Sequence, residues 1–196
     1  MLESEISVRR AIRSDLERIV QIHETELAVG ALAQLSHALR RRFFREIIDN
    51  PSSDSWVAEK CDGSVEGICF VLHEGFRHSR CTQVRLLTQL IGLVLCRPEF
   101  RPLLRHELLN RFSPKPSSCC EISHFAVSSN HQSQKIGSLL LSKVFNEARE
   151  AGLLGVITTS HNTRLLAHYK RRYAARVIGY ADLEIYRIET LYLPIS

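Results

Sequence analysis

The sequence predicts a single domain of the α/β (α+β) class, formed by residues 1–196. Segments that alternate like strands and segments with helical periodicity follow one another along the chain, so strands and helices are expected to share one core. With 196 residues, 44% of them hydrophobic, the chain can bury one substantial core. The segment Phe125–Leu141 joins an alternating apolar strand to an amphipathic helix through a polar turn, and this junction is the most informative feature of the chain.

The first part of the chain is predicted to form a strand, two helices and a hairpin. Ser14 followed by Glu17 is typical of a capping box that opens a helix. Pro51 is expected to end the second helix, and Asp62-Gly63 favours a tight hairpin turn. In chain order, the expected elements are a strand at Ile6–Ile12, a helix from Ser14 onward, a helix at Leu35–Ile48, and strands at Ser55–Glu59 and Val65–Leu72.

A basic segment, residues 76–118, follows this hairpin. It holds seven Arg and one Lys against two Glu, a net charge of +6, so the rest of the chain is nearly neutral although the whole carries +5. Apolar periodicity predicts two helices here, at Thr82–Leu95 and Pro98–Phe112. The charge points to an anionic ligand or surface nearby, with a solvated outer face as the alternative.

The second part of the chain contains a predicted anion site. The first amides of a helix have no partner within the helix, and the helix dipole adds positive charge there, so the amides from Gln132 to Gly137 could hold a phosphate. The final strand is long enough to pair with a second subunit, which makes a homodimer one option. The expected elements are strands at Glu121–Val127, Leu154–Ser160, Val177–Tyr180 and Leu183–Leu193, and helices at Gln134–Ala151 and Thr163–Tyr173.

Two motifs resemble those of the GNAT superfamily of acetyl-coenzyme A dependent N-acetyltransferases. The loop Gln132-Ser133-Gln134-Lys135-Ile136-Gly137 is similar to the family's pyrophosphate loop, and Asn162 with Tyr169 seven residues later is similar to its Asn…Tyr helix start. Lys135 replaces the usual first Gly, and Tyr173-Ala174 replace a usual Gly-Phe. The resemblance covers most of residues 6–75 and 120–193. It implies a GNAT fold: a central, mixed but mostly antiparallel sheet of about seven strands flanked by helices, with the basic segment as a helical hairpin between the third and fourth strands.

The resemblance also implies the site. Acetyl-CoA would be the cosubstrate, and the fourth strand would separate from the fifth to admit it. Tyr169 would protonate the leaving sulfur, with a plain core role as the alternative, and Asn162 would contact the cofactor, cap the helix, or both. The residues implied to bind the cofactor are Phe125, Ala126, Val127, Gln132, Ser133, Gln134, Lys135, Ile136, Gly137, Ser138, Asn162 and Tyr169; the Val127 amide is also implied to polarise the thioester carbonyl.

Glu121 is the leading candidate for the catalytic base and His124 is its rival. Strict alternation along the fourth strand would place these two side chains on opposite faces of the sheet, so only one of them would face the acceptor.

Lys135 leaves two outcomes open. A helical conformation at this position would leave the backbone amides available, whereas a left-handed one costs about 1–2 kcal/mol for a residue other than glycine. The lysine side chain could then either add a phosphate contact or obstruct the loop.

These observations predict an acetyl-CoA dependent N-acetyltransferase that moves an acetyl group to a primary amine of a small-molecule or peptide acceptor by direct attack. The basic segment suggests an anionic acceptor. The alternative is a catalytically degenerate module of the same fold that binds RNA or an anionic membrane surface, although no clear nucleic-acid motif occurs. No apolar stretch reaches the length of a membrane span and the start of the chain is not a secretory signal, so we expect a cytoplasmic protein. The six cysteines lack metal-ligand spacing, and no metal is expected.

Overall fold

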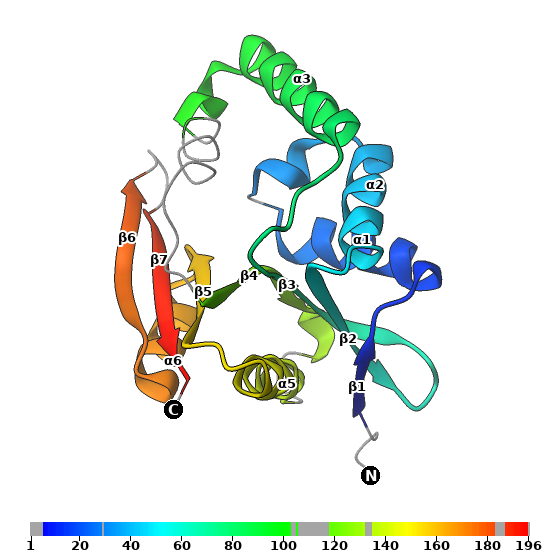
Figure 1. Ribbon diagram of the computed structural model, residues 1–196. Helices are drawn as coiled ribbons and strands as arrows, with labels where there is room; N and C mark the ends of the chain where they lie inside the picture. Colours follow the sequence, from blue (N-terminus) through cyan, green and yellow to red (C-terminus); the bar gives the residue numbers. More distant parts are fainter. Residues whose placement is uncertain are drawn as a thin grey trace.

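The computed structural model describes residues 6–28, 30–102, 105, 118–131, 135–182 and 187–195. Within these residues, seven strands form one twisted sheet in the order β1-β2-β3-β4-β5-β7-β6 (Figure 1). Neighbouring strands are antiparallel except β4 and β5, which run parallel. The strands are β1 (Ile6–Arg10), β2 (Ser53–Lys60), β3 (Val65–Leu72), β4 (Cys119–Val127), β5 (Gly155–Ser160), β6 (Arg176–Asp182) and β7 (Arg187–Pro194).

Helices cover both faces of the sheet. On one face, α1 (Leu16–Glu26) and α2 (His37–Ile48) share an apolar layer with β3, which includes Ile19 of α1, Phe44 of α2 and Ile68 of β3. On the other face, α5 (Ile136–Glu150) and α6 (Thr163–Tyr173) share a second apolar layer, in which the Phe145 and Tyr173 rings stack with centroids 4.7 Å apart. The mixed α/β architecture confirms the predicted fold class.

The helix α3 (Arg80–Cys96) belongs to the basic segment and lies beyond the sheet, next to α2 (Figure 1). Glu46 of α2 holds its first turn. The Glu46 carboxylate accepts hydrogen bonds from the Ser79 and Thr82 hydroxyls, both at 2.6 Å, and from the Ser79 amide at 3.1 Å. Burial opposes ionisation, but these hydrogen bonds prevail and lower the pKa of Glu46 to about 2. None of the described helices is long and apolar enough to cross a membrane.

The second predicted helix of the basic segment, Pro98–Phe112, lies mostly outside the described residues. Its first residues, Pro98–Phe100, form a 3-10 turn.

Two local expectations are wrong. Ser14 lies in a short 3-10 turn at Arg13–Asp15 and does not cap a helix. The α-helix begins at Leu16, and the Asp15 carboxylate accepts the amide of Ile12, three residues before it, at 2.9 Å. This is the bond that the last residue of a capping box makes. The final strand, β7, is paired on both sides, with β5 and with β6, so it has no edge left for a second subunit. The homodimer stays a prediction, and its sheet contact would have to use β1 or β6.

Candidate active site

The strands β4 and β5 separate partway along their length. They pair from Cys119 with Gly155 to Ile122 with Thr158, and the pairing ends there. Beyond this point β4 continues beside β3 to Val127, while β5 continues beside β7 to Ser160. This confirms the predicted separation of the fourth and fifth strands, and it opens one edge of β4 toward α6.

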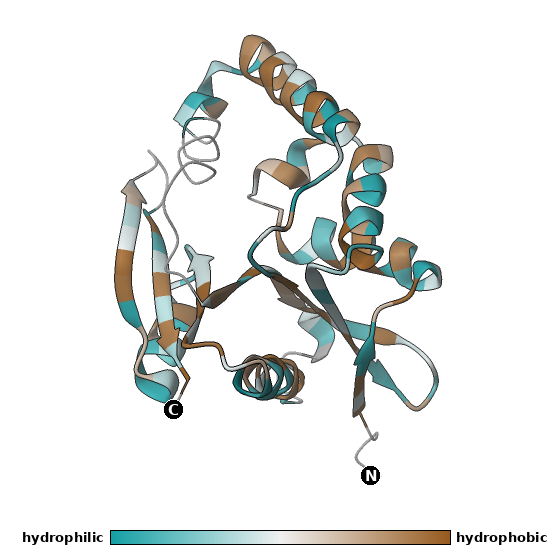
Figure 2. Ribbon diagram, viewed as in Figure 1, coloured by the Kyte–Doolittle hydropathy of each residue, from teal (hydrophilic) through white to brown (hydrophobic). Residues whose placement is uncertain are grey.

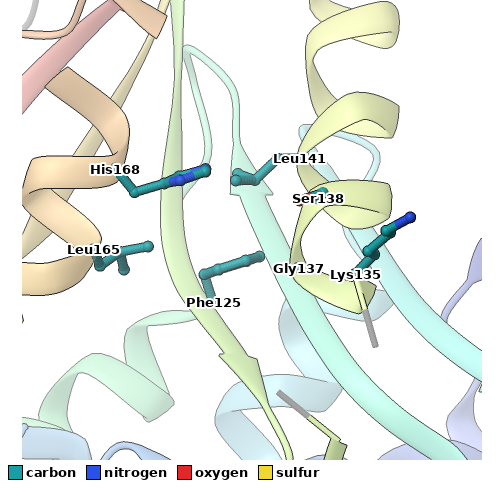
Figure 3. A pocket seen from close by; sticks show the side chains of 7 residues that line it. All are labelled: Phe125, Lys135, Gly137, Ser138, Leu141, Leu165 and His168. Carbon is teal, nitrogen blue, oxygen red and sulfur yellow. The ribbon is translucent and has the colours of Figure 1, made fainter. Parts of the chain in front are cut away.

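A cavity of about 140 Å³ lies at this separation. Its walls come from β4, the first turns of α5, and α6 (Figure 3). Phe125 lies at the centre of the view, and His168 and Leu141 point toward each other across it. The lining residues are Phe125, Lys135, Gly137, Ser138, Leu141, Leu165 and His168.

The beginning of α5 brings backbone amides to the cavity. Lys135 precedes the helix in a left-handed conformation, with φ 58° and ψ 7°. This is the costlier of the two geometries considered for that position, and it is the one that glycine adopts readily. The Lys135 side chain extends away from Phe125 and His168 in Figure 3, so its ammonium does not fill the space between α5 and α6. The predicted loop residues Gln132, Ser133 and Gln134 lie outside the described residues.

Gly137 allows the first turn of α5 to approach β4 closely. A Cβ atom at this position would lie 3.3 Å from Cζ of Phe125, tighter than an ordinary contact. Ile136 beside it is fully buried in the apolar layer, whereas Ser138 borders the cavity.

Tyr169 lies behind the cavity wall. It is four residues after Leu165 and therefore on the same face of α6. Its side chain is 0% exposed, and its hydroxyl has no hydrogen-bond partner among the described residues. Burial, with smaller contributions from Cys69 and Tyr173, raises the pKa of Tyr169, so the phenol holds its proton. Buried polar atoms of His23, Arg40, Ser55 and Trp56 also lack a partner among the described residues, so the free hydroxyl of Tyr169 is available to a ligand but does not by itself indicate one.

Asn162 caps α6. Its side-chain oxygen accepts hydrogen bonds from the amides of Arg164 at 3.0 Å and Leu165 at 3.2 Å. The capping role is therefore confirmed, and the cofactor contact of Asn162 stays a prediction.

A β-bulge in β4 changes the placement of the two candidate bases. His124 pairs with Phe70, but the next pair along β3 joins Val71 to Ile122, so Ser123 is an extra residue. Ile122 and Phe125 consequently both belong to the apolar layer under α5. Glu121 and His124 therefore lie together on the opposite face, and the expectation that alternation separates them is wrong.

His124 packs within an aromatic cluster on that face. Its ring centroid lies 5.4 Å from His23, 5.4 Å from Phe43 and 5.3 Å from Phe44. Burial, reinforced by His23 and His78, lowers the pKa of His124 well below its ordinary value. A neutral imidazole that resists protonation is a weak proton acceptor near pH 7, so Glu121, which is half-buried, is the better candidate for the base.

Residues 32–173 match the sequence model of the Acetyltransferase (GNAT) family. The protein belongs to the GNAT family. This confirms the family predicted from the two motifs. No curated protein sequence matches this GNAT chain.

Solved structures share the GNAT fold at low sequence identity. The ribosomal-protein-S18-alanine N-acetyltransferase from Escherichia coli has a TM-score of 0.63 and 11% identity, covering 98% of this chain and 95% of that chain. PaiA N-acetyltransferase from Thermoplasma acidophilum, in complex with coenzyme A, has a TM-score of 0.58 and 12% identity over 97% and 99%. YncA from Salmonella typhimurium, a putative acetyltransferase with acetyl-CoA, has a TM-score of 0.60 and 15% identity over 98% and 95%.

Three cavity residues of this GNAT protein were not predicted from the sequence: Leu141, Leu165 and His168. Leu141 lies one turn after Gly137, and Leu165 lies one turn before Tyr169, so helical spacing from the two motifs could have identified both. His168 directly precedes Tyr169 and had no comparable signal. Among the described residues, no group of three or more His, Cys, Asp or Glu side chains is placed to hold a metal ion.

Proposed function

We propose that the protein is an N-acetyltransferase that transfers an acetyl group from acetyl-CoA to a primary amine of a small-molecule or peptide acceptor by direct attack. One observation carries this proposal: the separation of β4 from β5 opens a cavity at the first turn of α5. The protein's family and the S18-alanine N-acetyltransferase among its structural relatives support an amine as the acceptor. An anionic acceptor rests only on the charge of residues 76–118.

The residues at the cavity suit an acyl-coenzyme A. Acetyl-CoA supplies an acetyl group activated as a thioester. The amides of Lys135, Ile136 and Gly137, with those predicted for Gln132, Ser133 and Gln134, would hold the pyrophosphate, and the Ser138 hydroxyl would add a donor. The β4 segment Phe125–Val127 would pair with the extended arm along the edge that β5 leaves.

Three groups would handle the charge and the protons. Glu121 would take a proton from the acceptor ammonium, so that the amine can attack. The Val127 amide would donate a hydrogen bond to the carbonyl oxygen as it gains negative charge. As the bond from the carbonyl carbon to sulfur breaks, Tyr169 would give its proton to the sulfur, and its raised pKa keeps the phenol protonated until that step. The attached nitrogen would release a second proton as it becomes a neutral amide, and that proton would restore the phenol. The hydroxyl of Tyr169 has no partner among the described residues and is therefore available for this role.

Calorimetry with acetyl-CoA and turnover against a panel of amines test the proposal. We expect a stoichiometric complex, and we expect Tyr169→Phe to lower kcat by roughly 10²- to 10⁴-fold, the usual contribution of a positioned acid. Tyr180→Phe is the matched control, because Tyr180 is 64% exposed on β6. Absence of binding at millimolar acetyl-CoA would overturn the proposal and favour the non-catalytic module. Unchanged turnover in Tyr169→Phe would rule out Tyr169 as the acid and would leave the proposed acetyl transfer standing.

A further inference from the structure

Helix α3 presents an apolar stripe to solvent. Four large apolar residues recur at spacings of three and four, so they share one helical face. They are Val84 at 63%, Leu87 at 45%, Ile91 at 45% and Leu95 at 77% exposure. Elsewhere on α3, Leu86 and Leu90 pack against Leu35 and Leu39 near α2. Figure 2 shows hydrophobic residues along much of α3, although this helix is the outermost one in the view.

Exposed arginines accompany this stripe. Arg80 lies four residues before Val84 on the same face, and Arg97 follows the stripe by two residues. Glu99 is the only acidic residue from Gly75 to Arg105. In the portion of the chain that the structure describes, none of the six arginines here has a carboxylate partner; they are Arg77, Arg80, Arg85, Arg97, Arg101 and Arg105.

Most arginines around β1, α1 and α2 differ from those beside α3, because they have acidic partners. Around β1, α1 and α2, seven arginines pair with Asp or Glu side chains: Arg9, Arg10, Arg13, Arg18, Arg40, Arg41 and Arg42. Among the described residues, Arg164, Arg171 and Arg172 of α6 also lack a carboxylate partner, but α6 exposes no large apolar side chain, whereas beside α3 the unpaired arginines accompany an apolar stripe. A surface that combines the two features suits a partner that is both anionic and apolar.

We propose that α3 docks the protein on an anionic lipid surface. The helix would lie in the plane of the interface, with Val84, Leu87, Ile91 and Leu95 entering the boundary between headgroups and acyl chains. The neighbouring arginines would bind lipid phosphates. Each arginine would stabilise the docked state, because the surface potential of anionic lipids is negative and attracts it. The anchor at Glu46 fixes α3 to the domain, so docking would hold the whole protein at the membrane.

Two other partners fit the surface less well. RNA offers phosphates but no apolar layer for the stripe, and the aromatic residues described in this segment, Phe76 and Phe100, are half-buried and poorly placed to stack on bases. A second copy packed through the same face would bring two sets of unpaired arginines together, and like charges repel. The proposal does not depend on catalysis, so its failure would leave the proposed acetyl transfer unaffected.

Flotation of the full chain with lipid vesicles tests the proposal. We expect binding to phosphatidylcholine vesicles that contain phosphatidylserine, little binding to phosphatidylcholine alone, and weaker binding as salt is raised. Arg80→Gln with Arg85→Gln should weaken binding by about tenfold or more, from the usual contribution of an arginine near an anionic surface. Leu87→Ser with Leu95→Ser should weaken it to a similar extent, on the order of tenfold.

Matched variants place the same changes elsewhere. Arg171→Gln with Arg172→Gln removes two exposed arginines of α6, and Leu154→Ser removes an apolar side chain that is 63% exposed. Both should bind vesicles like the unchanged protein, and thermal unfolding verifies that all variants are folded. Equal binding to both kinds of vesicle, or binding to neither, would overturn the proposal. So would a dimer that Leu87→Ser with Leu95→Ser dissociates, or RNA binding that survives these changes while vesicle binding is absent.

Discussion

Lys135 occupies a backbone conformation that favours glycine. The left-handed conformation costs a residue with a side chain about 1–2 kcal/mol, so replacement by glycine relieves this strain. Glycine also has more conformational freedom in the unfolded chain, which offsets part of the stabilisation. We therefore expect Lys135→Gly to raise the free energy of unfolding by up to about 1 kcal/mol in urea titrations. Lys135→Ala keeps the strained backbone and removes only the ammonium, so it should leave stability nearly unchanged.

The same pair of variants separates the backbone of Lys135 from its charge in acetyl-CoA binding. If the amides hold the pyrophosphate, calorimetry should give similar affinities for both variants and the unchanged protein. A parallel loss of affinity in both would instead assign the contact to the ammonium.

Ala174→Gly is the control for strain, because Ala174 is also left-handed, with φ 49°, at the end of α6. A fall in stability on Lys135→Gly would contradict the strain argument.

His23 should make the protein sensitive to acid. Burial, and then the nearby charge of Arg40, lowers the pKa of His23 to about 4 from 6.5. The unfolded chain therefore binds a proton at a higher pH than the folded one does. Protonation of His23 therefore does not affect the free energy of unfolding well above pH 6.5. The free energy of unfolding falls as the pH is lowered from 6.5 toward 4, by roughly 3 kcal/mol in all.

Replacement of His23 by Phe tests this assignment. Urea titrations between pH 7 and pH 4 should show a shallower loss of stability for His23→Phe, with the remaining slope due partly to His124, whose pKa is lowered in the same direction. His37→Gln changes an exposed histidine of α2 and should keep the original slope. An unchanged slope in His23→Phe would contradict the prediction.

At the scale of elements, Gly67 sets the distance between β3 and α5. A Cβ atom there would lie 2.8 Å from Cγ2 of Ile136 and 2.9 Å from Cδ1 of Leu140. We expect Gly67→Ala to displace the start of α5 and to lower the free energy of unfolding by about 1–3 kcal/mol, the usual cost of overpacking. Acetyl-CoA affinity, measured by calorimetry, should fall with it, because the amides of this turn move.

A second glycine provides the control for Gly67. Gly92 lies in α3, and apart from its own helix backbone no atom lies within 4 Å of its added Cβ. Gly92→Ala should therefore stabilise the protein by up to about 1 kcal/mol through helix propensity, without affecting acetyl-CoA. Equal stability changes of the same sign in the two variants would show that packing at Gly67 is unimportant.

Sequence patterns predicted most elements because each depends on its own residues. The helix Thr163–Tyr173 was predicted with its observed bounds, and the strand Val65–Leu72 likewise. The predicted cap failed because the α-helix begins at Leu16, one residue later than a Ser14 cap requires, and the Asp15 carboxylate binds the Ile12 amide and Arg9. The bulge at Ser123 could not be predicted from β4, because it exists only in the register with β3.

The candidate site was predicted in outline for the same reason. The family resemblance identified Gly137 and Ser138, which border the cavity, and Tyr169, which does not line it and is fully buried. Glu121 and His124 lie on the same face of the sheet because of the bulge. His168 lines the cavity because of the way α6 is oriented over β4. Both are properties of the packed structure.

For the whole molecule, the short contact between β4 and β5 joins two parts of the sheet. Only Cys119–Ile122 pair with β5, and the cavity lies next to this junction. A ligand that contacts both β4 and α6 should therefore stabilise the fold as a unit. Acetyl-CoA at a hundred times its Kd should add roughly 2.7 kcal/mol to the free energy of unfolding.

Thermal denaturation with increasing acetyl-CoA measures this effect. The Tm should rise continuously with ligand, and hydrogen exchange should slow in residues 123–127. Inorganic pyrophosphate at the same concentration is the control, since it can occupy the first turn of α5 but cannot reach along β4. An increase in Tm with no added protection in β4 would place the ligand elsewhere.

The extra residue at Ser123 has a consequence for genetic change. Deletion of this one codon would restore regular alternation and leave both faces of the strand as they are. If the segment from Phe125 onward kept its place, Ile122 would still oppose Val71 and Glu121 would still oppose Leu72, because only the residue without a cross-strand partner is lost. Loss of this single amino acid should thus remove the local kink and preserve the side-chain pattern of the strand.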